Sequence, residues 1–331
     1  MNDHEQPGQL RLLADDEIPH DVISGAFDAA RLTQARRLAG LTKKTVADTI
    51  GVSPVAVGQW EAGTASPPRP DNVEALAKAL EVPVSFLASG RPYARLDSAA
   101  AHFRSLRRTP AIQRSKAVAF TEQLWELTNA LEKRVRLPAV DLPGFSAGEV
   151  EQLGFPTDPI GAAGELRKYW GGLGLRRIPR VVRTMEQHGI IVTLAPFNPD
   201  DAKTIDAFST TQLPPRPVVV LTRGRADDVY RHRFTAAHEL GHLVMHGNCV
   251  PGDPLQEKEA DIFAAEFLTP KDQISPELPA RIDFNALIEL SATWGVCLST
   301  HFSVDARKSE WLPRQPIGAR INDWRRFETP T

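Results

Sequence analysis

The pentapeptide His238-Glu239-Leu240-Gly241-His242 holds the side chains with the clearest chemical potential in this chain. Apolar residues flank it on both sides, which predicts a buried helix. On a helix, residues four positions apart share a face, so both imidazoles can reach a single Zn²⁺ ion. Glu239 stands beside them and can take a proton from water at the metal. The pattern predicts two metal ligands and a general base, which are the core of a metallopeptidase site. The alternative is a buried helix whose histidines are only hydrogen-bonded.

A second helical pattern, a short distance downstream, offers the third ligand. Zinc in a hydrolytic site takes three protein ligands and leaves the fourth position to water. Glu257 and Asp261 are four residues apart and share a helical face. We therefore expect Glu257 to complete a His-His-Glu set and Asp261 to accept a hydrogen bond from the outer nitrogen of a ligating histidine. Glu259 is the alternative ligand, which helical geometry disfavours, and His246 is expected in the wall or outer layer of the site.

These two segments, Arg233 to His246 and Glu257 to Pro270, resemble the ImmA/IrrE family of bacterial metallopeptidases, and the ExxxD spacing is that of gluzincins. The resemblance implies an α+β zincin-like (gluzincin-type) fold, one Zn²⁺ ion, and cleavage or displacement of a DNA-binding repressor. It extends over about residues 158 to 305 and includes upstream segments expected as helix, helix-to-strand and buried strand: 165–170, 185–192 and 217–221. Asp261 stands where Asn is common in the family, which preserves a side-chain acceptor.

A different pattern occurs near the N-terminus. Thr42 and Ser53 are N-cap candidates, and Gly51 and Gly63 are expected to end helices. Two short helices joined by a turn that contains glycine form a helix-turn-helix, and this one resembles the XRE (Cro/repressor-type) DNA-binding domain. The alternative is a small all-α bundle that binds protein. The expected core residues are Val46, Ala47, Ile50, Val52, Val57 and Trp60.

The predicted recognition helix, residues 54–62, contains neither Lys nor Arg. Gln59 can hydrogen-bond to an adenine edge, and Val55 or Ala56 can contact a thymine methyl group. Phosphate contacts must then come from basic residues elsewhere, unless such a charge run forms only a solvated face. The candidates are Arg36, Arg37, Lys43, Lys44 and the run of Arg104, Arg107, Arg108, Arg114 and Lys116. A homodimer on a two-fold double-stranded DNA operator is expected to strengthen binding. The predicted DNA-binding residues are Pro54, Val55, Ala56, Gln59, Lys43 and Lys44.

The segment between the two patterns is expected to begin a helix at Thr109-Pro110 that runs to about Arg136. Its apolar residues recur at intervals of three and four, which indicates one apolar stripe. This stripe either pairs two chains in a homodimer or packs on the chain's own domains. Its members are Ala117, Phe120, Leu124, Leu127 and Leu131.

The length of 331 residues is sufficient for about two domains, each with its own core. An all-α DNA-binding domain is expected to precede the α+β domain. The predicted segments are a flexible arm (1–24), the helix-turn-helix domain (25–92), a helical connector (93–137), a linker rich in Pro and Gly (138–157), the metallopeptidase domain (158–310) and a C-terminal tail (311–331).

Composition sets the expected surroundings of the protein. A net charge of −2 gives no global attraction to nucleic acid or membrane. Neither a signal peptide nor an apolar run long enough to span a membrane is recognised. The chain contains two cysteines, Cys249 and Cys297, which cannot form a disulfide framework. A reduced cytoplasm is therefore the expected location.

These features together predict a DNA-binding transcriptional regulator with a zinc-dependent endopeptidase domain, whose substrate is a regulatory protein such as a repressor. The alternative is a transcriptional repressor, or the antitoxin of a toxin–antitoxin pair, in which the peptidase fold senses a signal or binds a partner such as the toxin. Both hypotheses share the two domains and differ in whether the zinc site turns over.

Overall fold

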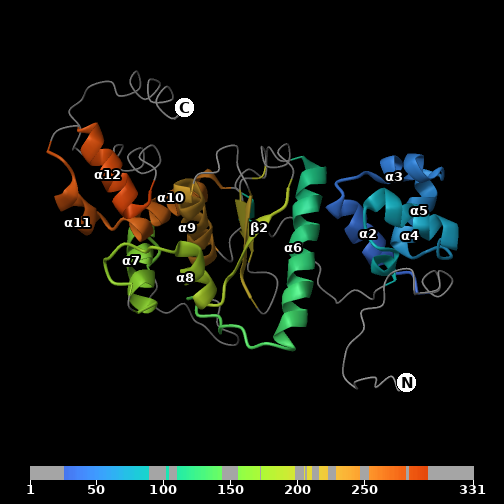
Figure 1. The fold of residues 1–331 in the computed structure, drawn as a ribbon, viewed down its shortest axis with the longest axis horizontal. Coiled ribbons are helices and arrows are strands. Elements are labelled where there is room, and N and C mark those ends of the chain that lie inside the picture. Colours follow the sequence, from blue (N-terminus) through green and yellow to red (C-terminus); the bar gives the residue numbers. More distant parts are fainter. Residues whose placement is uncertain are drawn as a thin grey trace, which may run out of the picture. The chain divides into compact units, whose positions relative to one another are not determined.

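A computed structural model describes residues 26–88, 102–103, 110–143, 156–171, 173–197, 205, 207–210, 216–222, 229–246, 253–280 and 283–296 (Figure 1). These residues form two compact units. The first contains the N-terminal helices, one long helix and the sheet, and the second contains the remaining helices. The predicted arm (1–24) and tail (311–331) lie outside the described residues.

The N-terminal part of the first unit is a bundle of short helices: α2 (Ala29–Leu38), α3 (Lys43–Ile50), α4 (Pro54–Ala62), α5 (Pro70–Leu80) and the 3₁₀ helix η2 (Val84–Leu87). Their ends follow from local chemistry. The Thr42 hydroxyl accepts from the backbone N–H of Thr45, and the Ser53 hydroxyl accepts from that of Ala56. Gly51 and Gly63 end α3 and α4 with positive φ angles of 74° and 65°. The predicted helix-turn-helix is confirmed, with the expected caps.

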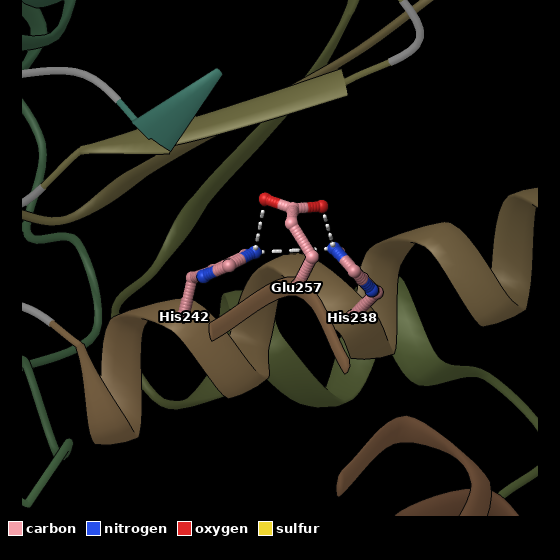
Figure 2. Close-up of side chains that lie close together, drawn as sticks. All are labelled: His238, His242 and Glu257. Atoms are coloured by element: carbon pink, nitrogen blue, oxygen red, sulfur yellow. Dashed lines mark hydrogen bonds and ion pairs between the residues drawn. The ribbon is translucent and has the colours of Figure 1, made fainter. Parts of the chain in front are cut away.

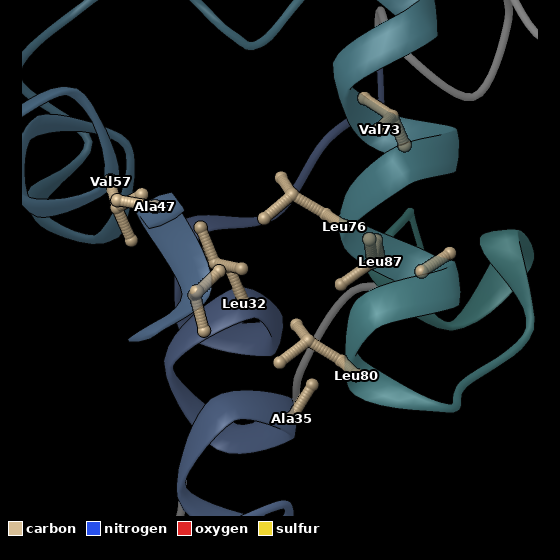
Figure 3. Close-up of a cluster of buried hydrophobic side chains, with 10 residues drawn as sticks. Leu32, Ala35, Ala47, Val57, Val73, Leu76, Leu80 and Leu87 are labelled. Carbon is tan, nitrogen blue, oxygen red and sulfur yellow. The ribbon is translucent and has the colours of Figure 1, made fainter. Parts of the chain in front are cut away.

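The core of this bundle is built from aliphatic side chains of all four α-helices (Figure 3). Leu32 of α2 and Leu76 and Leu80 of α5 point into the space between the helices and are at most 3% exposed. Three of the six predicted core residues, Val46, Ala47 and Val57, are fully buried, and Ile50, Val52 and Trp60 pack against them. The bundle therefore has a core of its own, which holds the α3–α4 turn in place.

Helix α6 (Ala111–Glu132) has contacts on two sides within the first unit. On one side the Glu126 carboxylate accepts from the Arg31 guanidinium at 2.5 Å and from the Gln34 amide at 3.1 Å, which joins α6 to α2. On the other side Ala117 is buried against the sheet. Phe120 and Leu124 of the predicted stripe also pack there, whereas Leu127 and Leu131 are 57% and 42% exposed. The first half of the stripe thus packs on the chain's own sheet.

The sheet has the strand order β1 (His102–Phe103), β3 (Ala207–Thr210), β4 (Val218–Thr222) and β2 (Ile191–Ala195). β2 runs parallel to β4, and β3 is antiparallel to both β1 and β4. Every residue of β4 is buried, as expected for an interior strand with an unbroken apolar sequence. Val218 and Val220 alternate onto the face that packs against α6. The predicted buried strand at 217–221 is confirmed.

The second unit is helical. It contains α7 (Pro159–Tyr169), α8 (Val181–Gln187), α9 (Val229–Met245), α10 (Pro254–Leu268), the short α11 (Lys271–Ile274), the 3₁₀ helix η4 (Ser275–Glu277) and α12 (Phe284–Trp294). Helix α9, which carries the HExxH pentapeptide, packs against α7, α8 and α10. With α8 leading into β2, the helices and strands expected at 165–170 and 185–192 are confirmed, and the chain is an all-α region followed by an α+β region.

The compact units do not coincide with the domains predicted from the sequence. The sheet groups with α6 and the N-terminal helices rather than with the HExxH helix. Within the predicted linker, Leu142 is fully buried and the backbone N–H of Asp141 donates to the carbonyl of His188. Part of that segment is therefore packed structure, and the exact domain boundaries stay a prediction. Among the described residues, no helix combines the length and hydropathy that crossing a membrane requires.

Candidate metal centre

Helix α9 is almost entirely buried from Arg233 to Val244. The apolar residues that flank the pentapeptide are suited to this burial. The polar residues of the pentapeptide therefore also lie inside the second unit. His238 and Glu239 are 0% exposed, and His242 is 1% exposed. Buried polar groups of this kind must interact with partners inside the protein or with a bound ligand. The second helix of the predicted site, α10, provides such groups.

Three side chains converge between α9 and α10 (Figure 2). The Glu257 carboxylate lies over the two imidazoles, with Oε2 at 3.5 Å from His238 Nε2 and Oε1 at 3.4 Å from His242 Nε2. The two Nε2 atoms are 3.1 Å apart. The structure therefore brings together the three residues that the sequence named as zinc ligands, and within the described residues no other His, Cys, Asp or Glu group of this kind occurs.

These side chains suit a zinc ion. Zinc binds imidazole nitrogen and carboxylate oxygen at about 2.0–2.1 Å, so ligand atoms at tetrahedral angles are about 3.3 Å from one another. The two Nε2 atoms are 3.1 Å apart, and they lie 3.5 and 3.4 Å from the two different oxygens of the Glu257 carboxylate. With one donor atom taken from each side chain, the three atoms lie within 4.8 Å of one another. Two nitrogens and one oxygen also form the donor set of hydrolytic zinc sites, with one position left open. The residues present thus fit Zn²⁺ in their donor chemistry, and their side chains lie close together.

Asp261 orients one of the candidate ligands. Its Oδ1 lies 2.8 Å from Nδ1 of His238, so Nδ1–H donates to the carboxylate. The proton is then held on Nδ1, and the lone pair of Nε2 faces Glu257 and His242. This is the outer position that the sequence predicted for Asp261.

The electrostatic environment of Glu257 favours its charged form. Burial on its own raises the pKa of this carboxyl, but its interactions with His238 and His242 outweigh burial and lower the pKa to about 2. A carboxylate that is ionised over a wide pH range is a suitable ligand for a cation.

Glu259, the alternative third ligand, is not part of the group formed by His238, His242 and Glu257. Its Oε2 lies 3.0 Å from Nε2 of His246, and Nδ1 of His246 lies 3.0 Å from Nδ1 of His242. Burial, as the largest effect, lowers the pKa of His246, which favours the neutral form of the ring. The structure therefore puts His246 next to a candidate ligand rather than among the ligands.

Gly241 contributes to the site through its lack of a side chain, which sequence reasoning did not use. A Cβ atom at this position would lie 3.0 to 3.3 Å from atoms of Phe263 on α10. That separation is tighter than ordinary van der Waals contact, so a glycine lets α9 and α10 approach closely and brings Glu257 to the histidines. A signal was available in the sequence, because a glycine inside a helix costs about 1 kcal/mol relative to alanine and usually has a packing reason.

Arg233 anchors α9 and was also not identified from the sequence. Its buried guanidinium donates to the backbone carbonyls of Gly295, Pro179 and Ile178 at 2.6 to 2.7 Å. Burial, followed by the nearby Arg177, lowers its pKa below the usual arginine value. This side chain fixes α9 to the segment before α8 and to the end of α12, and no short motif signals such a role.

The predicted DNA-reading residues lie on the accessible side of α4. Val55 is 67% exposed, Pro54 and Gln59 are exposed, and Ala56 is half-buried, whereas Val57 faces the core. Exposure of these side chains is what base recognition by a recognition helix requires.

Among the basic candidates, the structure separates Arg36 from the two lysines. The guanidinium of Arg36 binds both carboxylate oxygens of Glu61 and also donates to the carbonyl of Leu41. Arg36 is therefore an internal ion-pair partner between α2 and α4. Lys43 is 3.4 Å from Glu61 but 47% exposed, and Lys44 is exposed, so these lysines stay accessible to phosphate.

Fold and site together define a DNA-binding helix-turn-helix protein with a peptidase-type α+β region. Residues 32–87 match the helix-turn-helix family model, and residues 185–300 match the peptidase M78 family model, described as the IrrE N-terminal-like domain. The predicted fusion of an XRE-type helix-turn-helix with an ImmA/IrrE-type metallopeptidase domain is confirmed, in the predicted order. The chain has no significant match among the curated proteins compared with it.

Proposed function

We propose that the protein is a transcriptional regulator that binds a double-stranded DNA operator and cleaves a regulatory protein with a zinc-dependent endopeptidase domain. The observation that carries the proposal is the convergence of His238 Nε2, His242 Nε2 and a Glu257 carboxylate oxygen, all within 4.8 Å of one another. In the same helix, Glu239 is fully buried and follows the first candidate ligand, His238, in the sequence.

The catalytic roles follow from the chemistry of these side chains. A zinc ion acts as a Lewis acid that makes water a stronger nucleophile near neutral pH and polarises a peptide carbonyl. His238, His242 and Glu257 would hold the ion. Glu239 is the general base: its carboxylate takes a proton from the attacking water and then passes this proton to the amine that leaves when the peptide bond breaks.

The DNA half of the proposal rests on α4, which presents Val55 and Gln59, and on the exposed Lys43 and Lys44. Because the proposed partner is a DNA operator, the proposed location of the protein is the cytoplasm. A homodimer would match a two-fold operator, and the protein partner is a repressor-like substrate. The alternative, a repressor or toxin–antitoxin component whose peptidase fold only senses or binds, predicts the opposite result in the following experiment.

Two full-length variants in cells separate these functions. Glu239→Gln is expected to make a regulatory protein accumulate, because hydrolysis loses its base while DNA binding is kept. A Val55→Ala, Gln59→Ala double variant is expected to change promoter activity. Promoter output and the levels of candidate partner proteins are measured under inducing conditions, with the exposed Glu186→Gln as control. If Glu239→Gln behaves as wild type while the double variant relieves repression, the repressor or antitoxin function is favoured.

The reading of DNA by Gln59 gives a separate prediction. Gln59→Ala is expected to reduce discrimination between the protein's own promoter and random DNA by about 1 to 3 kcal/mol, the value of a bidentate adenine contact. The dissociation constants of the full chain for both DNAs are compared at moderate salt. Gln123→Ala, which removes an exposed glutamine from α6, is the control and should have no effect. Unchanged discrimination in Gln59→Ala would exclude this residue as a base reader.

A further inference from the structure

A chain of hydrogen bonds leads from α10 to the second candidate ligand. Oε2 of Glu259 lies 3.0 Å from Nε2 of His246, and Nδ1 of His246 lies 3.0 Å from Nδ1 of His242. His246 and His242 are 4% and 1% exposed, so the two rings are buried, whereas the Glu259 side chain is 31% exposed. Its far end, Nε2 of His242, is one of the three atoms that converge toward Glu257.

The directions of these hydrogen bonds can be assigned. A carboxylate is only an acceptor, so Nε2–H of His246 donates to Glu259. A neutral imidazole carries a single N–H, which leaves Nδ1 of His246 as an acceptor. The close contact between the two Nδ1 atoms then requires that Nδ1–H of His242 donates to His246. As a result Nε2 of His242 bears a lone pair, which is the form that binds a metal.

We propose that Glu259 is a positioning residue that acts through His246 to fix the metal-binding tautomer and ring orientation of His242. This inference rests on the proposed zinc site. Under this proposal an acidic residue of α10 orients the outer nitrogen of each histidine. Asp261 contacts His238 directly, and Glu259 contacts His242 through the ring of His246. Glu259 is thus an outer partner of the site rather than an alternative ligand.

Substitutions of Glu259 separate its role as an acceptor from its charge. Glu259→Gln keeps an acceptor of similar size, and zinc affinity is expected to stay close to wild type. Glu259→Met keeps the length but offers no comparable acceptor, and zinc affinity is expected to fall by about 10- to 100-fold, as is typical for loss of an outer partner. Lys258→Met, an exposed neighbour on α10, should leave the affinity unchanged. Dissociation constants are measured on the full chain by competition with a zinc chelator.

The tautomers themselves supply a readout that a general structural role would not move. In two-bond ¹H–¹⁵N spectra of the zinc-loaded wild type, His246 is expected to carry its proton on Nε2 and His242 on Nδ1. In Glu259→Met the His246 proton should no longer be confined to Nε2. Thermal unfolding of each variant checks that the fold is retained.

Several results would overturn the inference. A proton on Nδ1 of wild-type His246, wild-type zinc affinity in Glu259→Met, or equal losses in Glu259→Gln and Glu259→Met would each contradict it, and the last would assign the effect to charge. These outcomes leave the zinc site itself intact. A wild-type chain that binds no zinc would instead contradict the proposed function, and the inference with it.

Discussion

Purified wild-type protein is expected to contain about one zinc ion per chain, and His242→Ala is expected to contain almost none. Three ligands with one open position form a complete hydrolytic site, so loss of one ligand leaves only two donors. Because loss of an outer partner alone costs about 10- to 100-fold in affinity, loss of a direct ligand should cost more than about 100-fold. Metal analysis after dialysis against a weak chelator measures the stoichiometry.

Metal analysis with zinc in excess identifies the third ligand. Glu257→Ala is expected to lose zinc as His242→Ala does. Glu259→Ala should bind one zinc per chain when zinc is in excess, since it removes only an outer partner. Glu289→Ala, an exposed acidic residue of α12, is the control for loss of a carboxylate. Retention of zinc by Glu257→Ala together with its loss from Glu259→Ala would transfer the ligand role to Glu259.

The second large effect is expected at Glu239. Glu239→Gln should keep zinc and operator binding, because this residue is not among the three converging ligands, and it should reduce cleavage by about 100- to 10,000-fold. The amide is nearly isosteric with the carboxylate but cannot accept the proton of the attacking water. The rate is measured with purified protein and the regulatory protein that accumulates in Glu239→Gln cells.

Two comparisons make this result interpretable. Glu186→Gln makes the same chemical change at an exposed position of α8 and should cleave at the wild-type rate. Zinc content measured on the same Glu239→Gln sample distinguishes loss of the base from loss of the metal. Cleavage at the wild-type rate by zinc-loaded Glu239→Gln would show that the proton is removed by a different group.

Local sequence patterns were sufficient for much of the fold and for the identity of the ligand candidates. The caps at Thr42 and Ser53 and the glycines after α3 and α4 are decided by bonds within a few residues, so they could be predicted correctly. The pairing of His238 with His242 follows in the same way from the period of the helix.

The contacts of α6 could not be decided from its own pattern. An apolar stripe specifies that a face is buried and leaves open what buries it. The structure packs Phe120 and Leu124 on the chain's sheet and joins Glu126 to Arg31 of α2. The grouping of the sheet with this helix, rather than with α9, likewise depends on long-range packing.

By itself, the sequence determined which residues are the candidates for the chemistry: two histidines on one helix, a glutamate between them, and an acidic helix that follows. Only the tertiary structure decided which histidines the acidic residues of α10 contact. Glu257 faces both Nε2 atoms, while Glu259 contacts His246, which in turn contacts His242, the second candidate ligand. The physical reason is that helical spacing fixes directions within one helix, whereas the approach of two helices, here permitted by Gly241 against Phe263, sets which side chains meet.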